Sequence, residues 1–285
     1  MAGIRDIRRR IRVVKNIQQI TNAMKMVAAA RLKRAQERAE AARPYADKMM
    51  LMLKSLTQSL DSVEHPLLEV RPENNAAIIV IGAERGLAGS YNANIMKQTM
   101  ELLKNRDPSS VRLILLGKKA YGFFRKKNYP IELHSALPAS SIRFADVSQA
   151  AQRARDLFAS KEVDAVYLVY AKFINAAVQK PMVLRILPVE PYTEEKDGCM
   201  LEYIFEPEPT KLFASLLPSY IDTQVFRAAV EAVASEHGAR MTAMTAATNN
   251  AGDMIDSLTL SYNKARQAAI TKELLDIVGG AEALS

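Results

Sequence analysis

The sequence has 285 residues, of which 49% are hydrophobic and 25% are charged, and its formal net charge is +8. This length suits one large domain or two small ones with a buried core. The single cysteine, Cys199, excludes an internal disulfide and a cysteine-rich metal module. No run of about 18 apolar residues occurs, and the basic N-terminus lacks the apolar segment of a secretory signal. We therefore expect a soluble protein of a reducing compartment.

The positive charge is concentrated at one end of the chain. Residues 1–48 contain 13 Lys or Arg against 4 Asp or Glu, a net charge of +9, so the remaining residues carry −1. Such a basic segment attracts nucleic acid, anionic lipid or an acidic protein surface.

The N-terminal segment predicts a long helix. Between Gly3 and Arg43 there is no proline and no further glycine, and most residues are good helix formers. Pro44 is expected to kink or end this helix, although helical composition resumes from Tyr45 to Leu60. Apolar residues recur at spacings of three and four, which indicates a helical stripe. They are Ile4, Ile7, Ile11, Val14, Ile17, Ile20, Met24 and Val27.

The middle of the chain alternates between strand and helix patterns. The expected strands are Ala76–Gly82, Arg112–Gly117, Asp164–Phe173 and Met182–Val189. The expected helices are Asn92–Asn105, Lys118–Lys126 and Asp146–Ser160. Continuous apolar strands that alternate with helices predict a partly parallel sheet covered on both faces.

The C-terminal segment carries an a/d heptad pattern for about four heptads. Its members are Met241, Met244, Thr248, Ala251, Ile255, Leu258, Tyr262, Ala265 and Ala269. A helix of this length needs a partner, and the small alanines of the seam allow close approach of the N-terminal helix. We predict an antiparallel intramolecular coiled coil, with a plain helical bundle as the alternative. The expected domains are an N-terminal helix (1–60), a central α/β domain (70–205) and a C-terminal helix (210–285).

No catalytic pattern is convincing. The loop Gly82–Ser90 follows a strand, but it lacks the lysine of a phosphate-binding P-loop and the initial Gly-x-Gly of a dinucleotide fingerprint. A glycine-mediated turn is the better interpretation. The three histidines lack metal-ligand spacing, no Gly-x-Ser-x-Gly motif occurs, and Glu194–Glu195 lies in an acidic run that favours solvent exposure. We predict no catalytic residue, no metal and no cofactor.

Several segments resemble one family. Ile270–Ala283 resembles the C-terminal signature of gamma subunits of F-type ATP synthases, with Ile270, Thr271, Glu273, Asp276, Gly280, Ala281 and Ala283 on its pattern. Tyr262–Ala269 and Ile20–Ala28 match the same family. Arg85–Asn92 resembles its central loop, although Ala88 stands where cysteine is common. The resemblance covers essentially the whole chain.

The resemblance implies a fold and a role. The fold class is α/β, with a long antiparallel coiled coil of the terminal helices and a central Rossmann-like α/β domain. Such a subunit is the central rotor shaft inside a ring of three alpha and three beta subunits, with the epsilon subunit and the c-ring at its foot. It couples ion-driven c-ring rotation to ATP synthesis or hydrolysis at the beta subunits and is not itself catalytic. It is peripheral to the cytoplasmic face of a bacterial cell membrane, which it meets only through the complex.

The resemblance also implies partner contacts. Arg266 and Gln267 resemble the pair that bonds a beta-subunit loop, and a solvated arginine is the alternative. Met24 resembles a methionine that faces the beta subunit, or belongs to the apolar seam. Leu274, Leu275, Ile277 and Val278, with Leu284, would form an apolar tip in the bearing of the ring. Tyr203, Phe205 and Glu206 resemble foot residues near epsilon and the c-ring.

Two other classes remain open. A basic coiled-coil nucleic-acid-binding protein would explain the N-terminal charge, but no binding module is recognisable and few aromatic residues interleave the basic run. An enzyme with an α/β active site is the third interpretation.

Overall fold

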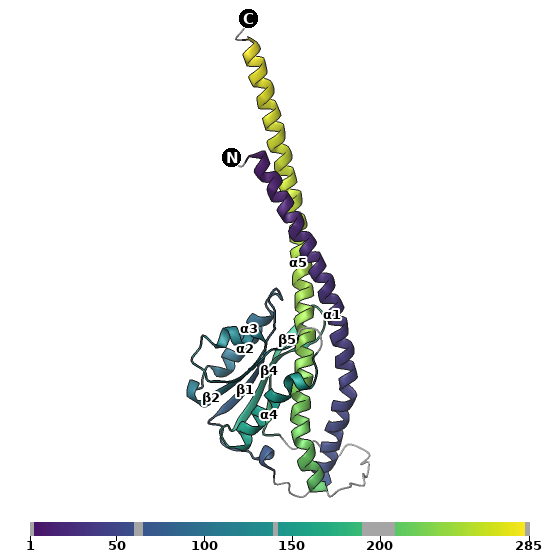
Figure 1. Cartoon of the computed structure of the whole chain (residues 1–285), viewed down its shortest axis with the longest axis vertical. Helices are drawn as coiled ribbons and strands as arrows, with labels where there is room; N and C mark the ends of the chain where they lie inside the picture. Colours follow the sequence, from purple (N-terminus) through teal and green to yellow (C-terminus); the bar gives the residue numbers. More distant parts are fainter. Residues whose placement is uncertain (1–2, 60–64, 139–141, 190–208, 283–285) are drawn as a thin grey trace. The chain divides into compact units, whose positions relative to one another are not determined.

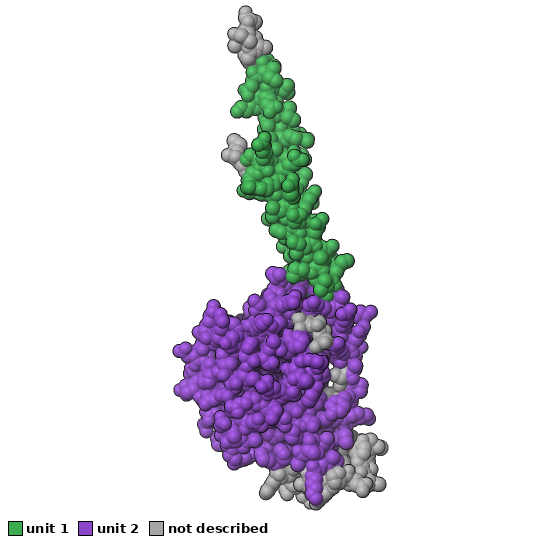
Figure 2. All heavy atoms as spheres, viewed as in Figure 1, with its two compact units in different colours: residues 1–27, 241–285 green, residues 28–240 purple. Residues whose placement is uncertain are grey.

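The computed structural model describes residues 3–59, 65–138, 142–189 and 209–282. The first and last elements of the chain are two long helices, α1 (Ile4–Ser59) and α5 (Pro209–Glu282), and the other elements lie between them in the sequence (Figure 1). The residues form two compact units, which are coloured separately in Figure 2: residues 1–27 with 241–285, and residues 28–240. Each unit takes a part of both long helices. The division into three domains at residues 60–70 and 205–210 stays a prediction.

Each long helix contains a proline within its span, Pro44 in α1 and Pro218 in α5. Proline removes one backbone hydrogen bond and crowds the preceding turn, which costs about 3 kcal/mol in a helix interior. Both helices nevertheless continue, so Pro44 does not end the first helix. Packing of a long apolar face stabilises helices more than local propensity does.

In the first unit the two helices run antiparallel. The Thr248 hydroxyl donates to the hydroxyl oxygen of Thr21, with an oxygen–oxygen distance of 2.8 Å. Gln18 lies beside Gly252, and Val14 lines one cavity with Met254. From Thr21 to Gln18 to Val14 the residue number in α1 decreases, while that of the neighbouring residue in α5 increases from 248 to 252 to 254. The two helices are therefore antiparallel. All nine residues of the predicted C-terminal heptad are buried or half-buried. The predicted coiled coil is confirmed, and the plain helical bundle is wrong.

The N-terminal stripe is only partly correct. The seam of α1 follows strict heptad spacing through Val14, Gln18, Thr21, Lys25 and Ala28, which are buried or half-buried. After Val14 each apolar residue of the predicted stripe comes one position before the seam residue. Ile17, Ile20 and Val27 are therefore 47%, 59% and 51% exposed. The heptad of α5 sets the seam, and its polar Thr248 and small Gly252 accommodate the polar residues of α1.

In the second unit the same two helices also meet. The Thr223 hydroxyl donates to the Met49 sulfur at 3.8 Å, and the Tyr220 hydroxyl donates to the Met50 sulfur at 4.0 Å. Met49 and Leu53 continue the heptad spacing of α1 and are buried. The apolar face of α1 is therefore used along most of its length.

The second unit contains a five-stranded sheet of order β3-β2-β1-β4-β5. Its strands are β1 (Ala76–Ile81), β2 (Val111–Leu116), β3 (Ile131–Ser135), β4 (Ala165–Phe173) and β5 (Gln179–Leu187). The first four strands are parallel, and β5 pairs antiparallel with β4. The predicted α/β class and mostly parallel sheet are confirmed. Strand β3 was not predicted, because it is a half-exposed edge strand without a continuous apolar run.

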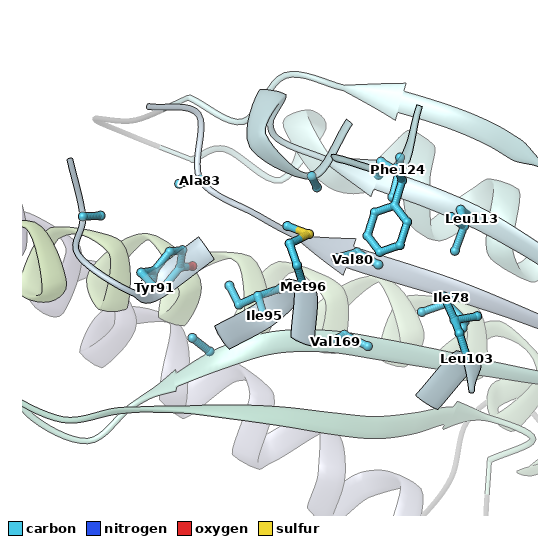
Figure 3. Close-up of a cluster of buried hydrophobic side chains, with 14 of the residues drawn as sticks. Ile78, Val80, Ala83, Tyr91, Ile95, Met96, Leu103, Leu113, Phe124 and Val169 are labelled. Carbon is cyan, nitrogen blue, oxygen red and sulfur yellow. The ribbon is translucent and has the colours of Figure 1, made fainter. Parts of the chain in front are cut away.

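Helices cover both faces of the sheet. On one face α2 (Tyr91–Leu103) and α3 (Lys118–Phe124) bury Ile78, Leu113 and Val169 in the cluster of Figure 3. On the other face α4 (Ala145–Ala159) packs against β1 to β4. Gly117 has a φ of +90°, and a Cβ there would collide with the carbonyl oxygen of Gly82. The turns at the carboxyl ends of β1 and β2 are therefore in close contact.

The Thr21–Thr248 contact gives a direct test of the antiparallel pairing. We expect the double variant Thr21→Cys/Thr248→Cys to form a disulfide within one chain, because the two side-chain atoms are already in contact. Non-reducing electrophoresis of the oxidised protein would show a fast-migrating monomer. The matched control Ile20→Cys/Thr248→Cys should not form it, since Ile20 is exposed. Disulfides found only between two chains would contradict the pairing.

Candidate functional site

The sheet has one topological switch point, between β1 and β4. From β1 the chain continues to β2 and β3 on one side, and it then returns to β4 on the other side. Open α/β sheets usually bind ligands in the crevice at the carboxyl ends of the strands beside such a point. This crevice is therefore the first place to look for a nucleotide.

Helix α5 occupies this position within the second unit. The Tyr91 hydroxyl, at the start of α2, donates to the Ala232 carbonyl at 3.0 Å. The Ser235 hydroxyl donates to the carbonyl of Ala171 in β4 at 2.9 Å. Residues 232–240 of α5 are buried all round the helix. A ligand at the switch point would have to displace this helix.

The loop Gly82–Ser90 after β1 is hydrogen-bonded to the segments beside it through Ala83 and Glu84. The Glu84 carboxylate accepts hydrogen bonds from the backbone N–H groups of Lys118 and Leu137 at 3.2 and 3.3 Å. These bonds and the Lys118 ammonium hold the pKa of Glu84 below its usual value despite partial burial, which acts in the opposite direction. The first N–H group of α3 thus binds a carboxylate of the protein itself. The interpretation of this loop as a turn is supported.

A buried charged cluster on α5 contacts the same loop. The Arg240 guanidinium donates to Glu236 at 2.7 Å and to the Gly86 carbonyl at 3.1 Å, and these two side chains are 9% and 2% exposed. Burial raises the pKa of the Glu236 carboxyl, and the Arg240 charge offsets part of this rise. This pair was not predicted from the sequence. The signal available was a Glu–Arg spacing of four residues in a helix segment rich in alanine.

The residues expected to contact the beta subunits lie on the surface of the first unit. Arg266 and Gln267 are exposed on α5. Leu274, Leu275, Ile277 and Val278 are 57%, 66%, 68% and 61% exposed. Met24 is half-buried beside the seam. Tyr203, Phe205 and Glu206 of the expected foot, and Leu284 of the tip, lie outside the described residues.

The pairing register explains why the tip is so exposed. Gln18 lies beside Gly252. Fourteen residues further toward the first residue of α1, Ile4 is therefore level with Arg266 of α5. Beyond that level α5 has no partner from α1 in the described part of the chain, and in Figure 1 its C-terminal end continues past the N-terminus of α1. Arg266 and Gln267 thus mark the transition from a paired to a single helix.

The histidines serve local structure. His65 accepts a hydrogen bond from the Leu67 N–H, His134 stacks on Tyr121, and His237 is buried beside Arg240. Within the described ranges, no group of three His, Cys, Asp or Glu side chains is placed to hold a metal ion. No helix in those ranges is both long and apolar enough to cross a membrane.

Comparison with known proteins decides the family. The family described as ATP synthase matches residues 3–284. The ATP synthase gamma chain of Desulforamulus reducens is 47% identical over 284 residues, and the alignment covers 100% of this chain and 100% of that one. That of Brevibacillus brevis is 46% identical over 99% of this chain and 98% of its own. The chain belongs to the family of ATP synthase gamma chains.

Solved structures agree with this family. A chain of the central stalk and c-ring structure of the Tetrahymena thermophila mitochondrial ATP synthase is 25% identical, with a TM-score of 0.61 over 80% of this chain and 99% of that one. A chain of the Euglena gracilis mitochondrial ATP synthase has a TM-score of 0.69 over 99% of this chain and 94% of its own, and at 20% identity it supports the fold alone. The predicted family is confirmed. It decides between the gamma-chain role and the nucleic-acid-binding alternative.

The buried Glu236 carboxyl predicts a pH effect in this gamma chain. Because its pKa is raised in the folded state, the native protein holds this proton more tightly than the unfolded chain does. Its contribution to the free energy of unfolding therefore decreases as the pH rises through the unfolded and then the native pKa. Glu236→Gln removes this dependence. We expect the stability of the variant, relative to that of the parent, to increase as the pH rises above the ordinary pKa of a glutamate carboxyl.

Urea unfolding at several pH values measures this difference. Glu101→Gln, at an exposed position of α2, is the matched control and should show no such trend. A stability difference that moves in favour of the parent with rising pH would mean that Arg240 outweighs the burial cost.

Proposed function

We propose that this chain is the central rotor shaft of an F-type ATP synthase, a gamma subunit that couples rotation of the c-ring to ATP synthesis and hydrolysis at the beta subunits. The observation that carries the proposal is the transition on α5 from a paired to a single helix at Arg266. Up to this transition the shaft consists of two helices side by side with different side chains, so it presents a different surface to each surrounding subunit. Such differential contact is what shifts a conformational equilibrium.

The apolar tip supports a bearing role. Leu274, Leu275, Ile277 and Val278 lie on a single helix and expose most of their surface. A contiguous exposed apolar surface is an aggregation liability unless a partner covers it. We infer that the upper part of the ring of three alpha and three beta subunits covers it. Apolar contacts without directional bonds suit a surface that must slide.

The charged and flexible residues below the tip suit a contact that forms and breaks. The Arg266 guanidinium can engage a carboxylate with two parallel hydrogen bonds, and Gln267 adds an amide. Met24 has a flexible and polarizable side chain that tolerates a moving partner. We assign these three residues to the beta-subunit contact. The exposed arginines of α1, with Arg9 79% exposed although it pairs with Asp6, complement acidic surfaces of the ring.

The lower partners are the epsilon subunit and the c-ring, with Tyr203, Phe205 and Glu206 as the proposed foot residues. Membrane association then passes through the complex, on the cytoplasmic face of the bacterial cell membrane. The Brevibacillus and Desulforamulus relatives support the bacterial type.

We also propose that the subunit is not catalytic. Two observations support this: α5 is hydrogen-bonded to α2 and β4 at the switch point, and the first N–H group of α3 is bound by the Glu84 carboxylate instead of by a phosphate. Nucleotide chemistry would then belong to other subunits of the complex.

Calorimetric titration tests this absence of nucleotide binding. We expect the purified chain to give no saturable heat with Mg-ATP and no ATP hydrolysis, because α5 fills the crevice. Micromolar affinity would contradict the proposal. Lys119, the lysine nearest Gly86, provides the matching variant: binding that disappears in Lys119→Ala would locate the nucleotide at this loop.

Arg266 tests torque transmission. We expect Arg266→Ala to leave assembly intact but to lower ATP hydrolysis and ATP-driven ion pumping, since a charge-assisted hydrogen bond is worth about 1.5–3 kcal/mol. The rates are measured in membrane vesicles with normal subunit content. Lys264→Ala removes an exposed cation from the same helix and should have little effect. Unchanged rates in Arg266→Ala would make it a solvated residue, and loss of the complex would make it structural.

A further inference from the structure

The contact between Arg240 and the loop Gly82–Ser90 is unusually rich. The two N–H groups of its Nη2 atom are shared among Glu236 at 2.7 Å and the carbonyl oxygens of Gly86 and Arg85 at 3.1 and 3.3 Å, and its Nε atom lies 3.4 Å from the Gly86 oxygen. Glu236 accepts from the same guanidinium, and its carboxylate also accepts from the backbone N–H of Glu84. One planar group therefore holds two successive carbonyls of the loop against α5.

This arrangement carries an energetic cost. Removing two charges from water is expensive, and a buried ion pair is often no more stable than apolar residues of similar volume. Both side chains are nevertheless almost fully buried. We infer that the ion pair serves to position other groups. These are the Arg85 and Gly86 carbonyls, to which Arg240 donates hydrogen bonds.

The loop itself is strained and partly exposed. Leu87 has a φ of +62°, which is uncommon for a residue other than glycine, and its side chain is 63% exposed. Such a conformation persists only when the surroundings hold it. On the sheet side, Asn92 accepts from the Ala83 N–H and Glu84 binds the start of α3. On the side of α5, the Arg240 cluster supplies the restraint.

Two further hydrogen bonds that join α5 to α2 and β4 are of a different kind. Tyr91–Ala232 and Ser235–Ala171 are single bonds from a neutral hydroxyl to a carbonyl. Charge-assisted bonds are roughly twice as strong, and a guanidinium forms several in fixed directions. Arg240 is therefore placed to resist twisting of the loop about α5 better than either hydroxyl.

We propose that Arg240, oriented by Glu236, is a positioning residue that fixes the Glu84–Ser90 loop to α5, so that torque passes between the sheet and the helix without slip. The proposal rests on the proposed rotor function. Arg240 touches no substrate, and its effect is on coupling rather than on the chemical step. We call the contact of Arg240 and Glu236 with this loop the clamp. Loosening the clamp should lower the number of ions pumped per ATP hydrolysed more than it lowers the rate of hydrolysis.

The test uses variants that avoid an unpaired buried charge. Glu236→Gln/Arg240→Met removes both charges at similar volume, and Arg240→Lys keeps the charge but loses the fork. The matched control is Arg153→Gln, which breaks an Arg–Glu pair between α4 and β3 without involving α5. Each variant is assembled into the complete ATP synthase, and ATP hydrolysis and ATP-driven ion pumping are measured in the same vesicles.

A second readout reports the loop directly. Trypsin cleaves after arginine, and Arg85 is the exposed residue whose carbonyl Arg240 holds. In the purified chain, cleavage after Arg85 should accelerate at least about tenfold in the double variant and less in Arg240→Lys, while cleavage after the exposed Lys126 stays unchanged. In the complex, pumping per ATP should fall to about half or less in the double variant and to an intermediate value in Arg240→Lys.

The outcomes separate the two proposals. Faster cleavage with normal pumping per ATP overturns the torque role, and unchanged cleavage overturns the clamp itself. If the double variant does not assemble, Arg240→Lys decides: faster cleavage with parental coupling overturns the proposal. The rotor function fails instead if vesicles whose complex lacks this chain pump ions as well as vesicles that contain it.

Discussion

The heptad seam between the two terminal helices is the constraint on which the rest of the molecule depends. Side chains of α1 and α5 meet at alternating spacings of three and four, so the direction and register of the pair are fixed together. Because α5 has 74 residues and α1 has 56, the longer helix must end in an unpaired segment. The exposed tip and the position of Arg266 both follow from this difference in length.

The sheet shows how a common nucleotide-binding architecture serves as a mechanical part. Its strand order retains a switch point of the kind that holds phosphates in other α/β proteins. Here Ser235 and the start of α2 hold a helix of the same chain at that place. Fold alone would have suggested an enzyme, and the contents of the crevice indicate a shaft anchor.

Much of the fold could be predicted because its signals are local. The C-terminal heptad and most apolar strands are visible as periodic patterns, and all nine heptad residues are buried or half-buried. Strand β3 escaped because an edge strand can remain half polar. Ile17 and Ile20 were assigned to the wrong face of α1. An apolar side chain favours burial, but its hydrophobicity does not show which partner buries it. For these two residues the partner lies outside the chain or the face remains in solvent.

The candidate site was harder to predict than the fold. Arg266 and the apolar tip came from family resemblance, since an exposed arginine has no pattern of its own. The Arg240–Glu236 cluster depends on contacts between residues about 155 apart in sequence, such as Arg240 and Arg85. Only the folded chain brings those groups together. Burial and electrostatics, which reveal the cluster, are properties of that folded arrangement.

The hydrogen bond between Thr21 and Thr248 has a consequence for the reach of the shaft. A slip of one heptad would place Thr21 opposite Ile255 or Met241, where its hydroxyl has no polar side chain across the seam. Polar residues in an apolar seam penalise such slips, at some loss of stability. Since seven residues of helix span about 10 Å, each slip would lengthen or shorten the protruding end of α5 by that amount. The hydrogen bond between these two threonines thus fixes how far the C-terminal end of α5 extends beyond α1.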